Sequence, residues 1–128
     1  MSLREYFDEK TGHGVIATAD AKGKVGIAVY AEPYVIDDGL IAFIMADRQS
    51  HANVQSNPSA AYLFMEAGGQ YAGKRFYLTK VRESAGGDVD DPELAKRFEK
   101  AASQYKGEKL SLVYFKVDRV LPLVGDKE

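Results

Sequence analysis

The sequence contains no cysteine, and it has only two histidines and four prolines among its 128 residues. Without cysteine there can be no disulfide, no thiolate nucleophile and no cysteine-bound metal. With two histidines, the chain has few side chains that could bind zinc or haem iron. No apolar run reaches the length that spans a bilayer, so we expect no membrane partner. The charged opening MSLREYFDEK lacks a long apolar core, and we therefore expect no signal peptide and a cytoplasmic protein.

Strong charge of either sign is also missing. The formal net charge is −2, whereas nucleic acids and anionic membranes favour a basic surface, so we expect no nucleic-acid partner. Apolar residues make up 45% of the chain and charged residues 28%, which is typical of a soluble globular protein. The length predicts a single domain over residues 1–128, small enough for oligomerisation to add useful burial.

The residue pattern predicts short strands interrupted by three short helices. Ser2 can cap the first helix, and Asp91 followed by Pro92 is typical of the start of the third. Pro33 predicts an edge, a bend or a bulge within one extended run. We expect helices at 2–12, 50–57 and 91–105, strands at 14–20, 25–36, 40–46, 59–67, 74–84 and 109–124, and a linker at 85–92.

Two of the expected strands, 40–46 and 59–67, are apolar on both faces and must be covered on both sides. Most links between strands are short and hairpin-like. This combination predicts a mainly β fold, a small antiparallel split β-barrel with short helices packed outside. The helices are too few to cover every apolar strand. A second copy of the chain would cover the rest, and we therefore expect a homodimer.

The stretch MADRQSHANVQSNP, residues 45–58, places polar residues where a strand ends and a helix begins. A helix N-terminus offers unpaired N–H groups and the positive end of the dipole. With Ser50 at the cap, Arg48 just before it and Asn53 one turn on, this start can hold a phosphate. Alternatively, Asp47 or Ser50 only caps a surface helix while Arg48 is solvated, and the pattern by itself favours this simpler reading.

Three other features also leave alternatives open. Lys74 and Arg75 begin a strand, where they would neutralise a phosphate or a partner's carboxylate, or else be solvated edge charges. His51 is expected to be a solvated or packed imidazole. No catalytic set and no metal site stand out. The aromatic residues would wall a flat ring system or, more commonly, form the core: Tyr30, Tyr34, Tyr62, Phe64, Tyr71, Phe76, Tyr77, Tyr105, Tyr114 and Phe115.

The order of these elements resembles the FMN-binding split-barrel family, the pyridoxamine 5'-phosphate oxidase-like proteins. The resemblance lies in GVIATADAKGKVGIAVYAEPYVIDDGLIAFIMADRQSHANVQSNPSAAYLFME and spans about residues 12–83. A strand, a glycine turn and a second strand are followed by a third strand that runs into a polar turn. The turn leads into a helix that contains an Asn and ends at an Asn-Pro pair. A strand like AAYLFME follows the helix. No single element is specific, but the ordered set is.

The resemblance implies a homodimer with FMN at the subunit interface. The end of the third strand, residues 44–46, would offer backbone groups to the isoalloxazine, and the turn at 48–50 would hold the phosphate together with Asn53. Tyr30 would lie near the ring, and the cations at 74 and 75 would add charge. The cofactor-binding residues that the resemblance implies are Tyr30, Ile44, Met45, Ala46, Arg48, Gln49, Ser50, Asn53, Lys74 and Arg75.

For function, the resemblance implies an oxidoreductase that moves hydride or electrons to a small molecule or redox partner through FMN. The alternatives are a module that binds or carries flavin, or another planar ligand, without turnover, and an interaction domain with an empty barrel. Family members often have Lys where Gln49 stands, which leaves Arg48 or Lys74 to supply the positive charge. Pyridoxamine phosphate oxidases also continue beyond a segment like VLPLVGDKE, so we do not expect oxidation of vitamin B6 here.

Overall fold

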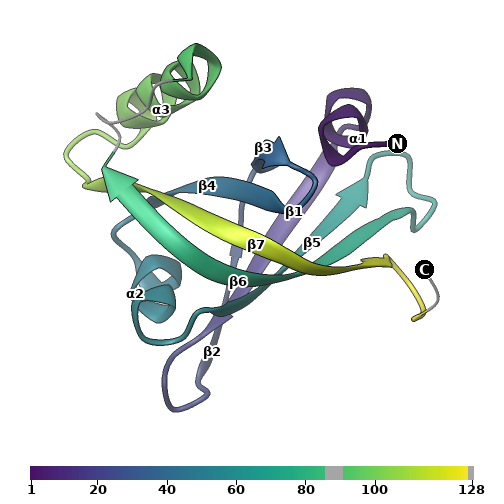
Figure 1. Ribbon diagram of the computed structural model, residues 1–128, viewed down its shortest axis with the longest axis horizontal. Helices are drawn as coiled ribbons and strands as arrows, with labels where there is room; N and C mark the ends of the chain where they lie inside the picture. Colours follow the sequence, from purple (N-terminus) through teal and green to yellow (C-terminus); the bar gives the residue numbers. More distant parts are fainter. Residues whose placement is uncertain (86–90, 127–128) are drawn as a thin grey trace.

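The computed structural model describes residues 1–85 and 91–126, so most of the linker expected at 85–92 lies outside the described residues. The described residues form three helices and seven strands (Figure 1). They are α1 (Leu3–Glu9), β1 (Gly12–Ala19), β2 (Val25–Val29), β3 (Tyr34–Asp37), β4 (Leu40–Ala46), α2 (Gln49–Ser56), β5 (Ser59–Glu66), β6 (Gly73–Ala85), α3 (Pro92–Gln104) and β7 (Leu110–Pro122).

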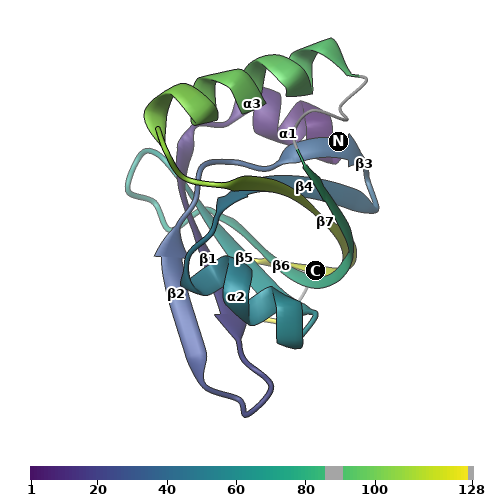
Figure 2. The ribbon, with the colours of Figure 1, turned by 90° about the vertical axis from the view of Figure 1, so that its left-hand side faces the viewer.

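All seven strands form one antiparallel sheet in the order β2-β1-β5-β6-β7-β4-β3. The sheet curls around a core but stays open between β2 and β3 (Figure 2), which confirms the expected mainly β split barrel with outer helices. The prediction of a single strand over 25–36 was wrong. Residues 30–33, which include Pro33, leave β2 on one edge and cross the open side to β3 on the other.

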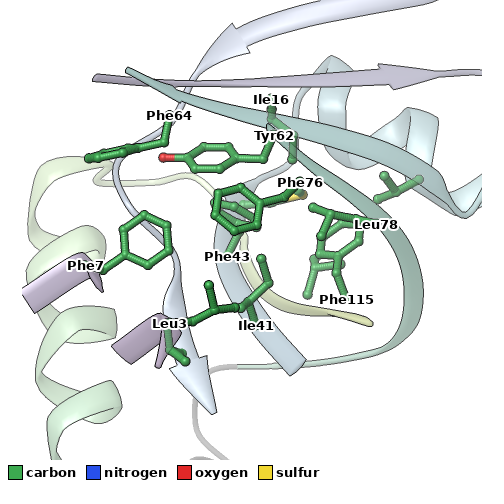
Figure 3. Close-up of a cluster of buried hydrophobic side chains, with 14 of the residues drawn as sticks. Leu3, Phe7, Ile16, Ile41, Phe43, Tyr62, Phe64, Phe76, Leu78 and Phe115 are labelled. Carbon is green, nitrogen blue, oxygen red and sulfur yellow. The ribbon is translucent and has the colours of Figure 1, made fainter. Parts of the chain in front are cut away.

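The inside of the barrel is filled by apolar and aromatic side chains (Figure 3). In β4 the odd-numbered positions Ile41, Phe43 and Met45 point into this core, as the two-residue period of a strand requires. The rings pack mainly edge to face, for example Phe7 against Phe64 with ring centroids 5.2 Å apart. The expectation that most aromatic residues form the core is therefore confirmed for Tyr62, Phe64, Phe76 and Phe115.

Two helices attach directly to the barrel. α1 begins with a capping box, in which Ser2 and Glu5 bond each other's backbone, and it buries Leu3, Tyr6 and Phe7 in the core. α2 lies against β1 and β2. Its Asn53 donates a buried hydrogen bond to Thr18 Oγ1 at 3.0 Å. Gly26 of β2 faces the start of α2, where a Cβ would lie 2.9 Å from Gln49 Oε1 and 3.1 Å from Asn53 Nδ2.

α3 packs on the outer face of the sheet, where Leu94 joins Tyr34, Ala42, Leu112 and Tyr114 in a second apolar cluster. Figure 2 shows α3 outside the curled sheet, above β3 and β4. β4 is therefore covered on both faces, by the core and in part by α3, as its doubly apolar sequence predicted. Among the described helices, none combines the length and the apolar character needed to cross a bilayer.

Candidate functional site

A cavity of about 840 Å³ lies between the outer face of β4, the connection from β2 to β3, the start of α2 and one face of α3. This volume is within the range of protein sites for small molecules and cofactors. The even-numbered residues of β4, Ala42, Ile44 and Ala46, line the cavity because their side chains point away from the core. The wall therefore combines an apolar strand face with polar groups from α2 and charged groups from α1 and α3.

The second half of β4 has an open edge beside this cavity. β7 pairs with the whole strand, but on the other edge β3 pairs only with residues 40–42. No other described strand adjoins β4 there. An unpaired strand edge carries backbone N–H and C=O groups that a ligand can bond. The odd-numbered residues of β4 bond β7, so Ile44 and Ala46 are the residues whose backbone groups face this open edge. The Ala46 carbonyl already accepts from the Arg48 N–H at 2.8 Å, which leaves the Ile44 N–H and C=O and the Ala46 N–H where the resemblance expects the isoalloxazine ring.

The start of α2 is a second source of free backbone donors. The helix begins at Gln49 with Arg48 as the N-cap, and within the described chain no side chain caps it. The expectation that Ser50 or Asp47 caps this helix was wrong. Ser50 is buried in the first turn, and Asp47 instead lies 3.5 Å from His51 Nδ1. The first N–H groups of the helix are thus left for water or a ligand.

Polar side chains gather around this helix start. Tyr30 and Gln49 line the cavity together with Ser50. Burial raises the pKa of the Tyr30 phenol, while the charge of Arg48 and the Ser50 hydroxyl act in the opposite direction. Tyr30 therefore stays a neutral hydroxyl at physiological pH and can donate or accept a hydrogen bond.

Arg48 is exposed, as the simpler interpretation expected, but its guanidinium is also paired. Its Nε and Nη2 donate to the two carboxylate oxygens of Glu108, at 2.8 and 2.7 Å. Its guanidinium also lies over the Tyr105 ring, 5.3 Å from the centroid. These contacts raise the pKa of Arg48 and lower that of Glu108. The positive charge at the start of α2 is therefore already paired with a carboxylate from beyond α3.

The opposite end of the cavity contains a charged network that connects α3 to β3. Arg97 donates to the Glu32 carbonyl at 2.7 Å and lies over the Tyr34 ring. The Tyr34 hydroxyl donates to the Asp91 carboxylate at the N-terminus of α3. Burial raises the pKa of the Glu32 carboxyl, which Arg97 partly offsets and Asp8 reinforces. This network positions α3 over the cavity.

Six of the ten cofactor residues implied by the resemblance line this cavity, and four do not. Met45 points into the core, and its backbone groups face β7 and not the open edge of β4. Asn53 is buried against Thr18. Lys74 lies over the Tyr6 ring at 5.0 Å, and Arg75 donates to the Pro122 carbonyl at 2.9 Å, so neither reaches the cavity within one chain. The six that line it are Tyr30, Ile44, Ala46, Arg48, Gln49 and Ser50.

Sequence reasoning missed the contribution of α3 and its neighbours. The stripe of α3 was recognised as apolar, but its partner surface was not identified, because a helix pattern does not show which strand it will cover. Glu108 had no signal at all, since it lies 60 residues from Arg48 in sequence. Tyr105, just after α3, had been named among the aromatic residues that would wall a ring. The cavity residues that were missed on α3 are Glu93, Leu94, Arg97, Lys100, Ala101 and Gln104.

Comparison with solved structures identifies the fold. The chain is similar to HupZ of Group A Streptococcus, with 22% identity, a TM-score of 0.75, and 100% of this chain and 98% of that chain covered. It is also similar to an FMN-binding protein from Syntrophomonas wolfei (18% identity, TM-score 0.71, 97% and 85% covered). HutZ, the haem storage protein of Vibrio cholerae, matches at 15% identity and a TM-score of 0.61, with 94% and 91% covered.

Other solved structures with this fold include an F420 reductase and proteins classed as pyridoxamine 5'-phosphate oxidases. No protein-family profile and no curated protein sequence matches the chain. The chain thus has the split-barrel fold of FMN-binding and pyridoxamine 5'-phosphate oxidase-like proteins, which confirms the fold that the resemblance implied.

Proposed function

We propose that this protein binds FMN in the cavity beside β4 and uses it, as a homodimer, to pass hydride or electrons to a small molecule. One observation carries the proposal: the open edge of β4 and the uncapped start of α2 meet in a single cavity of about 840 Å³. A phosphorylated planar ring needs such a pair of features. The ring needs a flat, apolar surface with backbone donors and acceptors, and the phosphate needs N–H groups at a helix start.

The phosphate would be held by groups that converge on the start of α2. The N–H groups of the first turn supply donors, and the Ser50 and Tyr30 hydroxyls lie at the same end of the cavity. Arg48 supplies a positive charge, which takes the place of the lysine that the family often has at the position of Gln49. Helix amides, hydroxyls and a guanidinium together suit an anion with several acceptor oxygens.

The ring would lie along residues 43–46, with the side chains of Ile44 and Ala46 beneath it and Tyr30 at its side. Bound FMN supplies hydride and electron transfer itself, so no catalytic acid or base from the protein is needed. The role of the chain is to orient the ring, to bond its edge through the β4 backbone and to exclude water from one face. This agrees with a sequence that has no obvious catalytic set.

The lining favours FMN over haem. Haem iron in proteins is bound by His, Cys, Met or Tyr. The described residues that line the cavity include no His, Cys or Met, so an iron ligand there would have to be Tyr30, Tyr34 or Tyr105, and the Tyr34 hydroxyl already donates to Asp91. His51 is held between Asp47 and Glu83, at 3.5 and 3.0 Å, and so it is the packed imidazole that the sequence led us to expect. HutZ shares the fold and stores haem, so haemin is the relevant competitor in a binding test.

The first test is a titration of the purified protein with FMN, riboflavin and haemin, followed by visible absorbance and flavin fluorescence. We expect saturable binding of FMN that is tighter than binding of riboflavin, because riboflavin lacks the phosphate. A protein that binds haemin but not FMN would contradict the proposal. Oxidation of NAD(P)H by the FMN-loaded protein with an added acceptor then separates an oxidoreductase from a flavin carrier.

Removing the phosphate contacts tests the placement. The double change Arg48→Ala with Ser50→Ala should weaken FMN binding about tenfold or more, because one charge-assisted hydrogen bond is worth about 1.5–3 kcal/mol. Riboflavin binding should hardly change. Lys96→Ala, which removes an exposed cation on α3 that does not line the cavity, is the matched control. Equal loss of FMN and riboflavin binding would show that these residues support the fold and do not hold a phosphate.

A further inference from the structure

Arg48 connects two elements that are distant in sequence. It is the N-cap of α2, and its partners Tyr105 and Glu108 lie in the turn between α3 and β7. That turn is compact: the Glu108 N–H donates to the Tyr105 carbonyl at 3.1 Å, and Gly107 has a φ of 82°, which favours glycine. The ring and the carboxylate are thus presented to the guanidinium together. As a result, the Arg48 side chain fixes the end of α3 to the start of α2.

The pair is well formed but accessible. The side chain of Arg48 is 63% exposed and that of Glu108 is 32% exposed. Exposed ion pairs contribute little net stability, because water solvates the separated charges well. Arg48 and Tyr105 both line the cavity, whereas Glu108 does not. An anion that enters the cavity therefore approaches a guanidinium whose charge Glu108 already balances, and it approaches from a different side.

We propose that Glu108 is a built-in competitor for Arg48, and that the phosphate of a bound ligand takes Arg48 from Glu108 and frees the end of α3. This inference rests on the proposed function, since it assigns the phosphate to the same helix start. The Glu108 carboxylate carries one negative charge and a phosphate dianion carries two. If both bound the same guanidinium, three negative charges would lie beside one positive charge. The phosphate gains helix N–H groups that Glu108 lacks, and it wins this competition.

Two consequences follow for ligand choice and for α3. A ligand without a phosphate, such as riboflavin, leaves the Arg48–Glu108 pair intact and gains nothing from the guanidinium. A phosphorylated ligand must first displace Glu108, so part of its attraction to Arg48 is spent on separating the pair. The C-terminal half of α3 contributes Lys100, Ala101 and Gln104 to the cavity wall, and the turn after it contributes Tyr105. This segment then becomes looser when the phosphate is bound. Occupancy of the cavity is thus coupled to the order of α3.

The test is the change Glu108→Gln, which keeps the shape of the side chain and removes its charge. FMN should bind about two- to fivefold more tightly to this variant, the range expected when a weak exposed ion pair no longer competes. The dissociation constant for riboflavin should stay the same. Glu99→Gln removes an exposed carboxylate from α3 itself and is the control for a general charge effect; it should leave both dissociation constants unchanged.

A second measurement follows the contact itself. In the wild type, FMN or millimolar inorganic phosphate should shift the Arg48 Nε–H resonance and speed amide exchange at residues 102–105, and riboflavin should do neither. If Glu108 instead holds Arg48 in place for the phosphate, Glu108→Gln will weaken FMN binding, and that result would overturn the inference. An unchanged dissociation constant for FMN would overturn it as well. If the wild-type protein binds no FMN, both the proposed function and this inference fail. If the wild type binds FMN and Glu108→Gln does not bind it more tightly, only this inference fails.

Discussion

At the scale of single residues, polar groups beside α2 are held by neighbours from distant parts of the chain. Glu83 of β6 accepts hydrogen bonds from Lys80 Nζ at 2.6 Å and from Gln55 Nε2 at 2.7 Å, and its other oxygen lies 3.0 Å from His51 Nε2. Burial by itself raises the pKa of the Glu83 carboxyl, but these hydrogen bonds outweigh burial and bring the pKa to about 2. Ionised Glu83 therefore ties α2 to β6.

This shift predicts how stability depends on pH. The pKa of Glu83 is lower in the folded protein than its ordinary value of 4.5, so its contribution is complete above pH 4.5 and is lost as the pH falls towards about 2. Glu83→Gln should lower the free energy of unfolding at pH 7 by on the order of 2 kcal/mol, and the difference from wild type should vanish near pH 2. Urea unfolding at several pH values measures this. A difference that persists at pH 2 would mean that the substitution acts through packing.

At the scale of elements, α3 is attached more loosely than the other helices. Leu94 is its one buried residue among those described, and Phe98 is partly buried beside it. The other attachments that the structure describes are polar: Arg97 donates to the Glu32 carbonyl, Tyr34 donates to Asp91, and Arg48 binds the turn after α3. By contrast, α1 buries three residues in the main core. Elements with few buried apolar contacts open locally at a lower free energy than the core.

Leu94→Ala should therefore release α3 while leaving the barrel folded. Loss of a buried leucine side chain costs about 2–5 kcal/mol in a core, which is enough to undock a helix held by one such residue. Hydrogen exchange should become faster along α3 and stay slow in β4 to β7, and FMN binding should weaken because α3 forms one wall of the cavity. Ser103→Ala, at an exposed position of α3, is the control. Unchanged exchange in α3 would show that its polar contacts suffice.

At the scale of the whole molecule, one apolar surface has no partner within the described chain. Val25, Ile27 and Val29 alternate along β2, and these residues are 75%, 74% and 79% exposed. β2 is also an edge strand, bonded only to β1. An exposed apolar row on a sheet edge is an aggregation risk unless another surface covers it. This row supports the proposed homodimer, because a second copy of the chain would cover it.

Ile27→Lys should consequently shift the protein from dimer to monomer. A buried lysine charge is costly at an interface but harmless on a solvated strand edge. Analytical ultracentrifugation should show the halved mass, and the far-UV circular dichroism should be unchanged. Val81→Lys, a matched change at an exposed valine of β6, should leave the dimer intact. A wild-type protein that sediments as a monomer would refute the homodimer, and with it the placement of FMN at a subunit interface.

Local pattern determined much of this protein. Alternating and continuous apolar runs predicted the strands, and Ser2 and Asp91 were identified as caps, which both are. The ordered set of elements led to the split barrel. These features were readable because backbone periodicity and capping depend on residues within a few positions of each other. The polar stretch at 45–58 indicated the start of α2 as one end of the site for the same reason.

Tertiary structure decided the rest. The crossing at 30–33, the open edge of β4 and the place of α3 over the cavity all depend on which strand pairs with which, and sequence spacing does not determine that pairing. Arg48 meets Glu108 and Tyr105 only because the turn after α3 returns to the start of α2. Lys74 and Arg75, which the resemblance expected to add charge to the site, instead contact the Tyr6 ring and the Pro122 carbonyl, because β6 lies between β5 and β7. Contacts between distant segments arise from packing of the whole sheet, and a local pattern carries no information about them.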